Sequence, residues 1–288
     1  MKKKCIVMFS GGLDSRLAIK IMQKKGFEVL AVFFKLPFGT GCCSEGCSFN
    51  FSQLQGIKLK VFDCTKGKLL KEYLEVIKKA KHGKGAGVNP CIDCRIFMLK
   101  KVKKFADEQK IESIVTGEVT GQRPMSQQKK QIGVIEKESE LEGRIIRPLI
   151  DFHKIQGRSR KPQIALAKKF KIKYPSPAGG CLLCEKALKK RLETLLKRGL
   201  NEEEINLVGI GRHFMFGKIW VVIGRDEKEN KIIELSKAGK VIEPDYPAPS
   251  AVIMSKSLSV NNKINKLIQA YSKKGSLKDR EKFDKEKL

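Results

Sequence analysis

Two groups of residues in this chain have types and spacing that can do chemistry. The first is Ser10 to Ser15, which reads SGGLDS and lies between a short apolar run and a helical pattern. Glycines let a backbone approach a phosphate closely, and the N–H groups at a helix amino terminus attract an anion. The two serine hydroxyl groups can add hydrogen bonds. Because no Gly-Lys-Ser/Thr ending is present, we expect a phosphate loop other than the Walker type.

The second group consists of two C-x-x-C pairs, Cys91 with Cys94 and Cys181 with Cys184. The first pair stands just before a helical pattern, where the helix dipole and nearby Arg95 are expected to favour thiolates. Four cysteines at this spacing fit a closed tetrahedral zinc site, and they also fit an iron–sulfur cluster. The residues alone leave both metals open.

The chain has nine cysteines, an odd number, and no secretory signal pattern. A complete disulfide framework is therefore not expected, and we predict a reduced, cytoplasmic protein. Cys42, Cys43 and Cys47 form another dense group that is a candidate for a second metal site. Cys5 and Cys64 stand in strand-like runs and are predicted to be small core residues.

The elements that must position these residues follow from the apolar pattern. Strand-like runs and helical stretches alternate through the first half of the chain. This alternation is typical of a parallel sheet with crossover helices, which is an α/β, Rossmann-like fold. The predicted strands are 5–9, 29–34, 59–63 and 111–116, and the predicted helices are 13–25 and 96–106.

The remainder of the chain predicts a smaller unit of mixed α+β structure. Strands are expected at 218–223 and 231–235 around a turn at 225–230, followed by an amphipathic stretch at 264–271. We predict three parts with these bounds: a nucleotide-binding domain at 1–195, a small basic domain at 196–254, and a basic helical or disordered tail at 255–288.

Sixty lysines and arginines against thirty-one acidic residues give a formal charge of +29. A charge of this size attracts polyanions over a long range, so nucleic acid is the expected partner. A Lys-rich surface that is merely solvated is the alternative. No uninterrupted apolar stretch approaches the length of about 18 residues that a membrane span requires, so no membrane partner is expected.

The SGGLDS loop resembles that of the PP-loop ATP pyrophosphatases, whose pattern SGGxDS follows the first strand. The resemblance implies that ATP is cleaved between its α and β phosphates, leaving AMP on an activated carbonyl oxygen. Asp14 is then expected to help hold the Mg²⁺ of Mg–ATP, although an acid in the first turn is also favoured by the helix dipole alone. The residues expected to contact the nucleotide within the loop are Ser10, Gly11, Gly12, Asp14 and Ser15.

Two further stretches resemble enzymes that put sulfur into tRNA. The stretch from residues 42–44 through 89–95 looks like the part of tRNA 2-thiouridylases that carries a reactive cysteine, which corresponds to Cys94. Residues 116–127, with Arg-Pro-Leu at 147–149, look like tRNA 4-thiouridine synthetases, and Gly117 and Gln122 in this stretch are candidate nucleotide contacts. We therefore expect an ATP-dependent tRNA sulfurtransferase that makes thiouridine, with tRNA and a sulfur donor, sulfide or a cysteine desulfurase, as partners. A homodimer is considered as well.

The iron–sulfur members of these thiolases hold a 4Fe–4S cluster through three cysteines. The resemblance implies that Cys91, Cys94 and Cys181 are the ligands, with Cys184 as a fourth ligand or a bystander. In the competing persulfide mechanism Cys94 or Cys181 carries the sulfur and the other releases it by forming a disulfide. We favour the cluster because Cys91 has no role in a mechanism with two cysteines, and zinc is the alternative metal.

The second unit resembles the small basic domain of the NFACT family at residues 211–214 and 221–230. That resemblance implies RNA contact, with Arg212 and Arg225 as candidate phosphate ligands. Trp220 could stack on a base, but a core position is the safer interpretation.

Two other functions are compatible with parts of this pattern. A PP-loop ligase that forms an amide on a small molecule would have the same loop, but it would not need the cysteines. An RNA-binding protein held together by a metal would need the cysteines and the positive charge, but it would not need an intact SGGLDS loop.

Overall fold

The computed structural model of the chain describes residues 2–39, 45–82, 86–122, 125–176, 180–254 and 261–288, which form two compact units. The first unit comprises residues 1–85 and 89–184, and the second comprises 86–88 and 185–288. Among the described helices, none combines the length and the apolar character needed to cross a membrane.

The first unit is built on a five-stranded parallel sheet with the order β3-β2-β1-β4-β5. Chain direction and register are set by pairs such as Cys5 with Val29 on one side of β1 and Cys5 with Ser113 on the other. β1 therefore lies at the point where the strand order reverses, and the carboxyl ends of β1 and β4 are neighbours. The strands are β1 (Lys4–Met8), β2 (Glu28–Lys35), β3 (Lys58–Asp63), β4 (Ser113–Thr116) and β5 (Ile145–Ile146).

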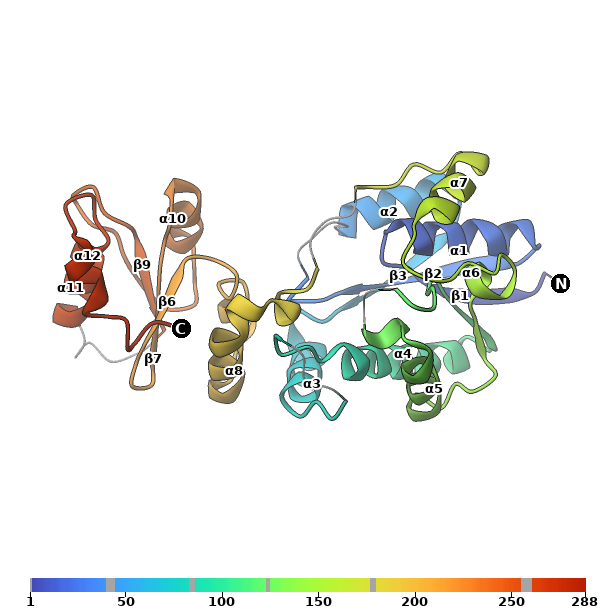
Figure 1. The fold of residues 1–288 in the computed structure, drawn as a ribbon, viewed down its shortest axis with the longest axis horizontal. Helices are drawn as coiled ribbons and strands as arrows, with labels where there is room; N and C mark the ends of the chain where they lie inside the picture. The colour runs from blue at the N-terminus through green and yellow to red at the C-terminus, as the bar shows by residue number, and fades with distance from the viewer. Residues whose placement is uncertain (1, 40–44, 83–85, 123–124, 177–179, 255–260) are drawn as a thin grey trace. The chain divides into compact units, whose positions relative to one another are not determined.

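Helices cover both faces of this sheet (Figure 1). One face carries α1 (Leu13–Lys24), α2 (Glu45–Leu54), α6 (Pro148–Asp151) and α7 (Lys161–Lys169), and the other carries α3 (Gly67–Lys78), α4 (Cys91–Glu108) and α5 (Lys129–Glu138). Successive side chains of β1 alternate between the two cores, so that Val7 packs with Leu17 of α1 while Ile6 packs with Leu99 of α4. The predicted α/β, Rossmann-like fold is confirmed.

The second unit contains a four-stranded antiparallel sheet with the order β6-β7-β9-β8. Its strands are β6 (Arg212–Phe216), β7 (Ile219–Ile223), β8 (Lys240–Ile242) and β9 (Ala251–Met254). Its helices are α8 (Lys189–Arg198), α9 (Glu202–Ile205), α10 (Glu227–Glu234), α11 (Asn261–Ala270) and α12 (Leu277–Glu281). Single 3₁₀ turns lie at Met125–Gln127 and Leu182–Cys184 in the first unit and at Lys186–Leu188 in the second.

The bounds of the units differ from those drawn on the sequence. The first unit ends at Cys184, eleven positions before the predicted boundary at 195. The predicted amphipathic stretch at 264–271 forms most of α11, and Ile264 and Leu267 pack with Phe214 in the core of the second unit. Residues 261–288 are thus part of that unit.

The predicted strand at 231–235 is wrong, because these residues belong to α10 and its carboxyl end. Asp226 caps the helix by accepting a hydrogen bond from the backbone N–H of Glu229 at 3.0 Å. With the amino end fixed by this cap, a single apolar anchor, Ile233, is buried against the sheet while Ile232 stays exposed. The apolar run at 231–235 therefore lies on a helix that buries Ile233 and leaves its other apolar residues exposed.

His213 lies in the core of the second unit with Trp220 stacked on its ring. Its Nε2 lies 2.6 Å from the carbonyl oxygen of Ile210, and the indole N–H of Trp220 donates to Nδ1 at 3.1 Å. Burial, with the charge of Arg191, lowers the pKa of His213 to about 3. His213 is thus a neutral structural residue, and the structure confirms that Trp220 is a core residue.

This burial makes the stability of the second unit depend on pH. The folded state keeps His213 neutral, whereas the unfolded chain binds a proton near pH 6.5, so the stability is present above that pH and is lost as the pH falls towards 3. Lowering the pH from 7 to 5 is expected to remove about 2 kcal/mol through this residue. Urea unfolding followed by the fluorescence of Trp220, the single tryptophan of the chain, measures the effect.

The matched control is His213→Gln, which keeps a donor and an acceptor but does not titrate in this range. The difference in unfolding free energy between pH 7 and pH 5 should be smaller in this variant. An identical pH dependence in both proteins would show that His213 is not the group responsible.

Candidate functional site

The SGGLDS loop connects the carboxyl end of β1 to α1. Gly11 has a φ of +79°, a left-handed conformation that glycine adopts without strain, and Gly12 is the N-cap residue of α1. The hydroxyl of Ser15 donates to the carbonyl oxygen of Gly12 at 3.0 Å and lies 3.2 Å from the hydroxyl of Ser10. No side chain caps the amino end of α1 within the described residues, so its first N–H groups are available to an anion.

Arg16 holds this loop in place through hydrogen bonds to backbone carbonyl groups, and the sequence did not predict this role. Its Nε donates to the carbonyl oxygen of Gly11 at 2.6 Å, and its Nη1 donates to that of Lys173 at 2.8 Å. The guanidinium also lies 4.5 Å from the ring centre of Phe51. The signal in the sequence was a charged residue three positions after Leu13, on the face of α1 that faces the core.

Asp14 carries the feature expected of a cation ligand. Its Oδ1 is buried and has no hydrogen-bond partner among the described residues. Burial raises the pKa of this carboxyl, while the charge of Arg160 acts in the opposite direction. A buried carboxylate oxygen without a partner is costly, and a bound Mg²⁺ would satisfy it.

Gly117 brings the end of β4 against the loop. A Cβ atom at this position would lie 2.7 Å from both the carbonyl carbon of Asp14 and the backbone nitrogen of Ser15, so only glycine fits without a shift of the backbone. Gln122, the other predicted contact in this stretch, has a buried side-chain nitrogen with no partner in the described part of the chain. Its carbonyl oxygen accepts from the side chain of Gln128 at 2.8 Å.

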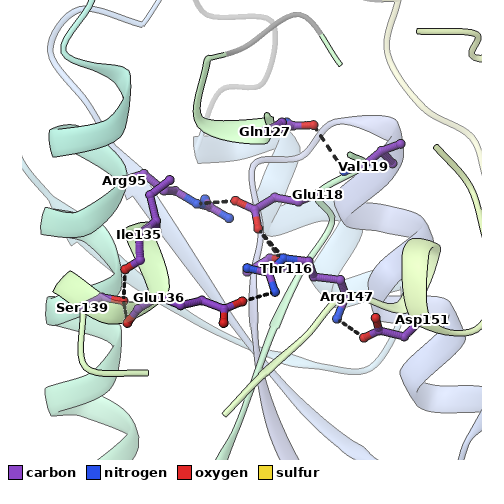
Figure 2. A network of polar contacts seen from close by, with 10 residues as sticks. All are labelled: Arg95, Thr116, Glu118, Val119, Gln127, Ile135, Glu136, Ser139, Arg147 and Asp151. Atoms are coloured by element: carbon purple, nitrogen blue, oxygen red, sulfur yellow. Dashed lines mark hydrogen bonds and ion pairs between the residues drawn. The ribbon is translucent and has the colours of Figure 1, made fainter. Parts of the chain in front are cut away.

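Glu118, the next residue, is the centre of a buried ionic network (Figure 2). Its Oε1 accepts from Nε of Arg95 at 2.9 Å, and its Oε2 accepts from Nε of Arg147 at 3.0 Å. The hydroxyl of Thr116 donates to the same Oε2 at 2.9 Å, and Arg147 also pairs with Glu136. One carboxylate thus connects α4, the end of β4 and the residue that precedes α6.

The charge state of Glu118 follows from these partners. Burial by itself raises the pKa of the carboxyl, but the charges of Arg95 and Arg147 outweigh it and lower the pKa below its usual value. The carboxylate therefore stays ionised. Glu118 and Arg147 were present in the stretches quoted from the sequence, but their pairing joins positions 29 residues apart and could not be read from spacing.

The two C-x-x-C pairs come together in the first unit. Cys91 begins α4, and the backbone N–H of Asn89 donates to the carbonyl oxygen of Leu183 at 2.9 Å. This bond holds the turn that contains Cys184 against the start of the helix. As a result the sulfur atoms of Cys91 and Cys184 lie 3.4 Å apart. Cys184, predicted to be a fourth ligand or a bystander, is therefore in direct contact with Cys91, a predicted ligand.

The thiols differ strongly in their surroundings. Hydrogen bonds from the thiols of Cys181 and Cys91 lower the pKa of Cys184, which is exposed, to about 3. Burial raises the pKa of Cys94, whose sulfur lies 3.5 Å from the hydroxyl of Tyr73. We expected the start of α4 to favour a thiolate at Cys94. The structure does not bear this out, because burial raises the pKa of the thiol by more than the charge of Arg95 lowers it.

Metal ligation at these cysteines was predicted, and two observations bear on it. In the described ranges, no group of three or more His, Cys, Asp or Glu residues is arranged to hold a metal ion. The donor chemistry nevertheless fits a soft metal or an iron–sulfur cluster, because the first unit has two close C-x-x-C pairs. The contact at 3.4 Å between the sulfur atoms of Cys91 and Cys184 is a thiol–thiol hydrogen bond.

The other cysteines have distinct settings. Cys5 and Cys64 are fully buried, and their predicted place in the core is confirmed. Cys47 accepts a hydrogen bond from Nη2 of Arg16 at 3.2 Å. Cys42 and Cys43, predicted to join Cys47 in a second metal site, lie outside the described residues.

The basic residues expected to meet RNA in the second unit have partners within the protein. Arg212 donates to the carbonyl oxygen of Gly224 at 2.9 Å, and its guanidinium lies 5.1 Å from the ring centre of Tyr271. Arg225 is paired with Glu229. A polyanion that binds this unit would therefore meet other basic residues whose charges are not engaged within the protein.

Comparisons with known proteins identify the family of the first part of the chain. Residues 1–169 match the model of the family described as thiamine biosynthesis protein (ThiI). A tRNA-specific 2-thiouridylase MnmA of Nitratiruptor sp. is 30% identical over 124 residues, covering 41% of this chain and 35% of that protein. A probable tRNA sulfurtransferase of Methanosarcina mazei is 25% identical over 124 residues, covering 41% and 29%. The chain thus spans about a third of the length of these relatives.

Solved structures with a similar fold include a 4-thiouridine synthetase in complex with RNA and ATP. It has a TM-score of 0.45 and 22% identity, covering 71% of this chain and 53% of that one. A predicted subunit of a tRNA methyltransferase from Methanocaldococcus jannaschii has a TM-score of 0.39 and 20% identity, covering 58% and 76%.

The contact between Gly117 and the loop gives a direct test of the site. Gly117→Ala is expected to lower the free energy of unfolding by about 1–3 kcal/mol and to weaken ATP binding, because the new methyl group must displace the backbone at Asp14 and Ser15. Urea unfolding and titration calorimetry with ATP measure the two effects.

The matched control is Gly133→Ala in α5, where a Cβ atom has no neighbour within 4 Å. Alanine in a helix should leave ATP binding unchanged and stabilise the protein by up to about 1 kcal/mol. Equal behaviour of the two variants would contradict the tight contact at Gly117.

Proposed function

This chain belongs to the ThiI family, and on that basis we propose that it is an ATP-dependent tRNA sulfurtransferase that converts a uridine to a thiouridine. One observation carries the proposal: the SGGLDS loop and the thiols lie at the same edge of the sheet. Gly117 touches the loop at Asp14, and Glu118 binds Arg95, which follows Cys94 in the first turn of α4. Matches to proteins named as a tRNA thiouridylase and a tRNA sulfurtransferase support it.

The activation step uses the loop. A uridine carbonyl oxygen attacks the α phosphorus of ATP, so that AMP is joined to the oxygen and pyrophosphate leaves. The N–H groups at the start of α1 and the hydroxyls of Ser10 and Ser15 would hold the pyrophosphate, and Asp14 would hold Mg²⁺. AMP then becomes the leaving group at the ring carbon, which is far better than a free carbonyl oxygen.

The sulfur step uses the thiols. A cysteine persulfide, formed by a sulfur donor, attacks the ring carbon and expels AMP, leaving the ring carbon joined to the enzyme through a disulfide. A second thiol then attacks the cysteine sulfur of that bond, forms a cysteine disulfide and leaves the sulfur on the uridine. The contact of Cys91 with Cys184 supports an exchange of this kind, and both join Cys94 and Cys181 as candidates for it.

The favoured form of the proposal is a 4Fe–4S cluster at these cysteines, and the persulfide route above is its alternative, because a cysteine that binds iron is not free to form the disulfide. Cys91, Cys94 and Cys181 would hold it, Cys184 is available as a fourth thiol, and zinc is the alternative metal. When bound, the cluster would supply an iron that accepts sulfide as the sulfur source. Tyr73 is buried beside the half-buried Cys94, with its hydroxyl 3.5 Å from the Cys94 sulfur, and so excludes water from that side of the thiol.

We also propose that the second unit is an NFACT-type RNA-binding domain that holds tRNA for the first unit. The net charge of +29 supports a polyanionic substrate. Residues 185–288 would then extend the binding surface beyond the part of the chain that matches the ThiI family.

The function is tested by incubating the protein with unmodified tRNA, Mg–ATP and sulfide, or with a cysteine desulfurase and cysteine. Nucleoside analysis by mass spectrometry should show thiouridine that depends on ATP. Asp14→Asn should lower the yield by about 100-fold or more, because the loss of a charged ligand weakens the stabilisation of the departing pyrophosphate.

Asp107→Asn is the matched control, because Asp107 forms an exposed pair with Arg144 at 2.9 Å on the far part of α4. It should leave the yield unchanged. Formation of AMP with a small-molecule amide and without thiouridine would support the ligase function in place of tRNA thiolation.

The cluster is tested separately by iron, sulfide and zinc analysis of protein purified without oxygen. Cys91→Ser, Cys94→Ser and Cys181→Ser are each expected to lower the iron content strongly, because each removes one thiolate ligand. Cys64→Ser, at a buried cysteine assigned to the core, is the control and should retain iron if the protein folds. Zinc without iron in the wild-type protein would contradict the cluster and leave the persulfide mechanism.

A further inference from the structure

A pocket of about 740 Å³ lies in the second unit, apart from every residue used above. It is formed by α11, α12, the turn between them, and the segment that precedes β9. Its size lies within the range of sites that hold small ligands, which is about 300–1,000 Å³. The side chains that give it chemical character are Tyr246, Lys266, Lys273, Lys274, Lys282 and Phe283.

The pocket is strongly basic. Lys266, Lys273 and Lys274 are exposed and have no ion-pair partner in the part of the chain that the structure describes. Lys282 pairs with Asp279 at 2.8 Å. Asp279 is the single acidic residue among the lining residues, and its carboxylate is paired with Lys282. Three ammonium groups around one pocket are therefore left for an anion that the protein itself does not supply.

The pocket also has an aromatic wall. Tyr246 is 40% exposed, and Phe283 is half-buried and held edge-on by Phe216. Exposed aromatic rings among unpaired lysines are the combination used for single-stranded nucleic acid, where bases stack on rings and phosphates meet cations. An inorganic anion would use the lysines but not the ring of Tyr246.

The walls are held in place before any ligand binds. Gly275 in the turn between α11 and α12 leaves no room for a Cβ atom, which would lie 2.1 Å from the carbonyl oxygen of Ala270. Ser276 caps α12 by accepting from the N–H of Asp279, whose carboxylate accepts from the hydroxyl of Ser276 at 2.6 Å. Arg280 donates to the carbonyl oxygen of Ala270 at 3.1 Å. A fixed pocket loses little entropy on binding.

We propose that this pocket binds an unpaired nucleotide of the RNA substrate. The phosphates on either side of the nucleotide contact Lys266, Lys273 and Lys274, and its base stacks on Tyr246. The inference rests on the proposed function, which makes RNA the substrate. It places the RNA contact of the second unit on α11 and the following turn, away from Arg212 and Arg225, which have partners within the protein.

The test measures RNA binding by the full chain with fluorescence anisotropy, using labelled tRNA and a labelled single-stranded RNA of about 12 nucleotides. The triple variant Lys266→Ala/Lys273→Ala/Lys274→Ala should bind the single strand about 10–100-fold more weakly near 150 mM salt. The slope of log K against log salt should fall by roughly 2, since each lost phosphate contact removes about 0.7.

The matched control removes the same charge from other exposed positions of the second unit. Lys228→Ala/Lys237→Ala/Lys240→Ala changes residues that do not line the pocket. It should weaken binding much less, because only the long-range field changes. Fluorescence of Trp220 verifies that both triple variants keep the fold of the unit.

Variants of Tyr246 test whether the ligand of the pocket is single-stranded RNA or another anion. Tyr246→Ala should weaken binding of the single strand about 10-fold without changing the salt slope, and Tyr246→Phe should restore it, because stacking requires only the ring. Equal losses in the two triple variants, or no loss in Tyr246→Ala, would overturn the proposal. So would competition by free phosphate or AMP at the concentration of the strand, which would assign the pocket to a small ligand.

The outcomes also separate this inference from the proposed function. Thiouridine formation with RNA binding that is insensitive to the pocket would refute the pocket alone. Binding of RNA that depends on the pocket, without any thiouridine formed by the wild-type protein, would refute the sulfurtransferase alone.

Discussion

The buried carboxylate of Glu118 is the interaction on which the site depends. It joins Arg95 in the first turn of α4 to Arg147 before α6, and it directly follows Gly117, which touches the phosphate loop. The carboxylate stays charged because two guanidinium groups offset the cost of its burial. Losing one partner of such a buried pair typically costs about 3–5 kcal/mol, since the other charge is left without compensation. The carboxylate of Glu118 therefore fixes the position of the amino-terminal part of α4 relative to the phosphate loop.

The sheet explains why this centre lies where it does. The order β3-β2-β1-β4-β5 places the carboxyl ends of β1 and β4 side by side at the reversal of strand order. In open α/β sheets this is where ligands bind, because the loops diverge to opposite faces. One loop leads from β1 to α1 and supplies the N–H groups for a phosphate. The other leads away from β4 and supplies Gly117 and Glu118, so the two loops meet because their strands are neighbours.

The sequence predicted those parts of the site that depend on local backbone chemistry. SGGLDS identified the loop because glycine and serine perform their role within six consecutive residues, and the alternating apolar runs identified the sheet. The local pattern did not predict structure or role correctly where contacts with residues distant in the sequence determine them. The pattern at 231–235 predicts a strand, because neither the cap at Asp226 nor the face of the helix towards the sheet can be read from five residues. Arg16 and Glu118 were missed because their partners lie elsewhere in the chain.

The thiol pKa values of the cysteines also depend on burial, which the sequence pattern does not contain. The helix start predicted thiolates at Cys91 and Cys94, and the family resemblance made Cys184 a fourth ligand or a bystander, but neither contains information on burial. In the folded chain Cys94 lies against Tyr73, where burial raises the pKa of its thiol, while the exposed Cys184 accepts hydrogen bonds from two thiols, which lower its pKa. Cys94 is half-buried beside a tyrosine and Cys184 is exposed, so the two thiols differ in their access to solvent and to a reaction partner. Sequence spacing could not show this difference, because both cysteines stand in a C-x-x-C pair and only the fold decides which of them is exposed.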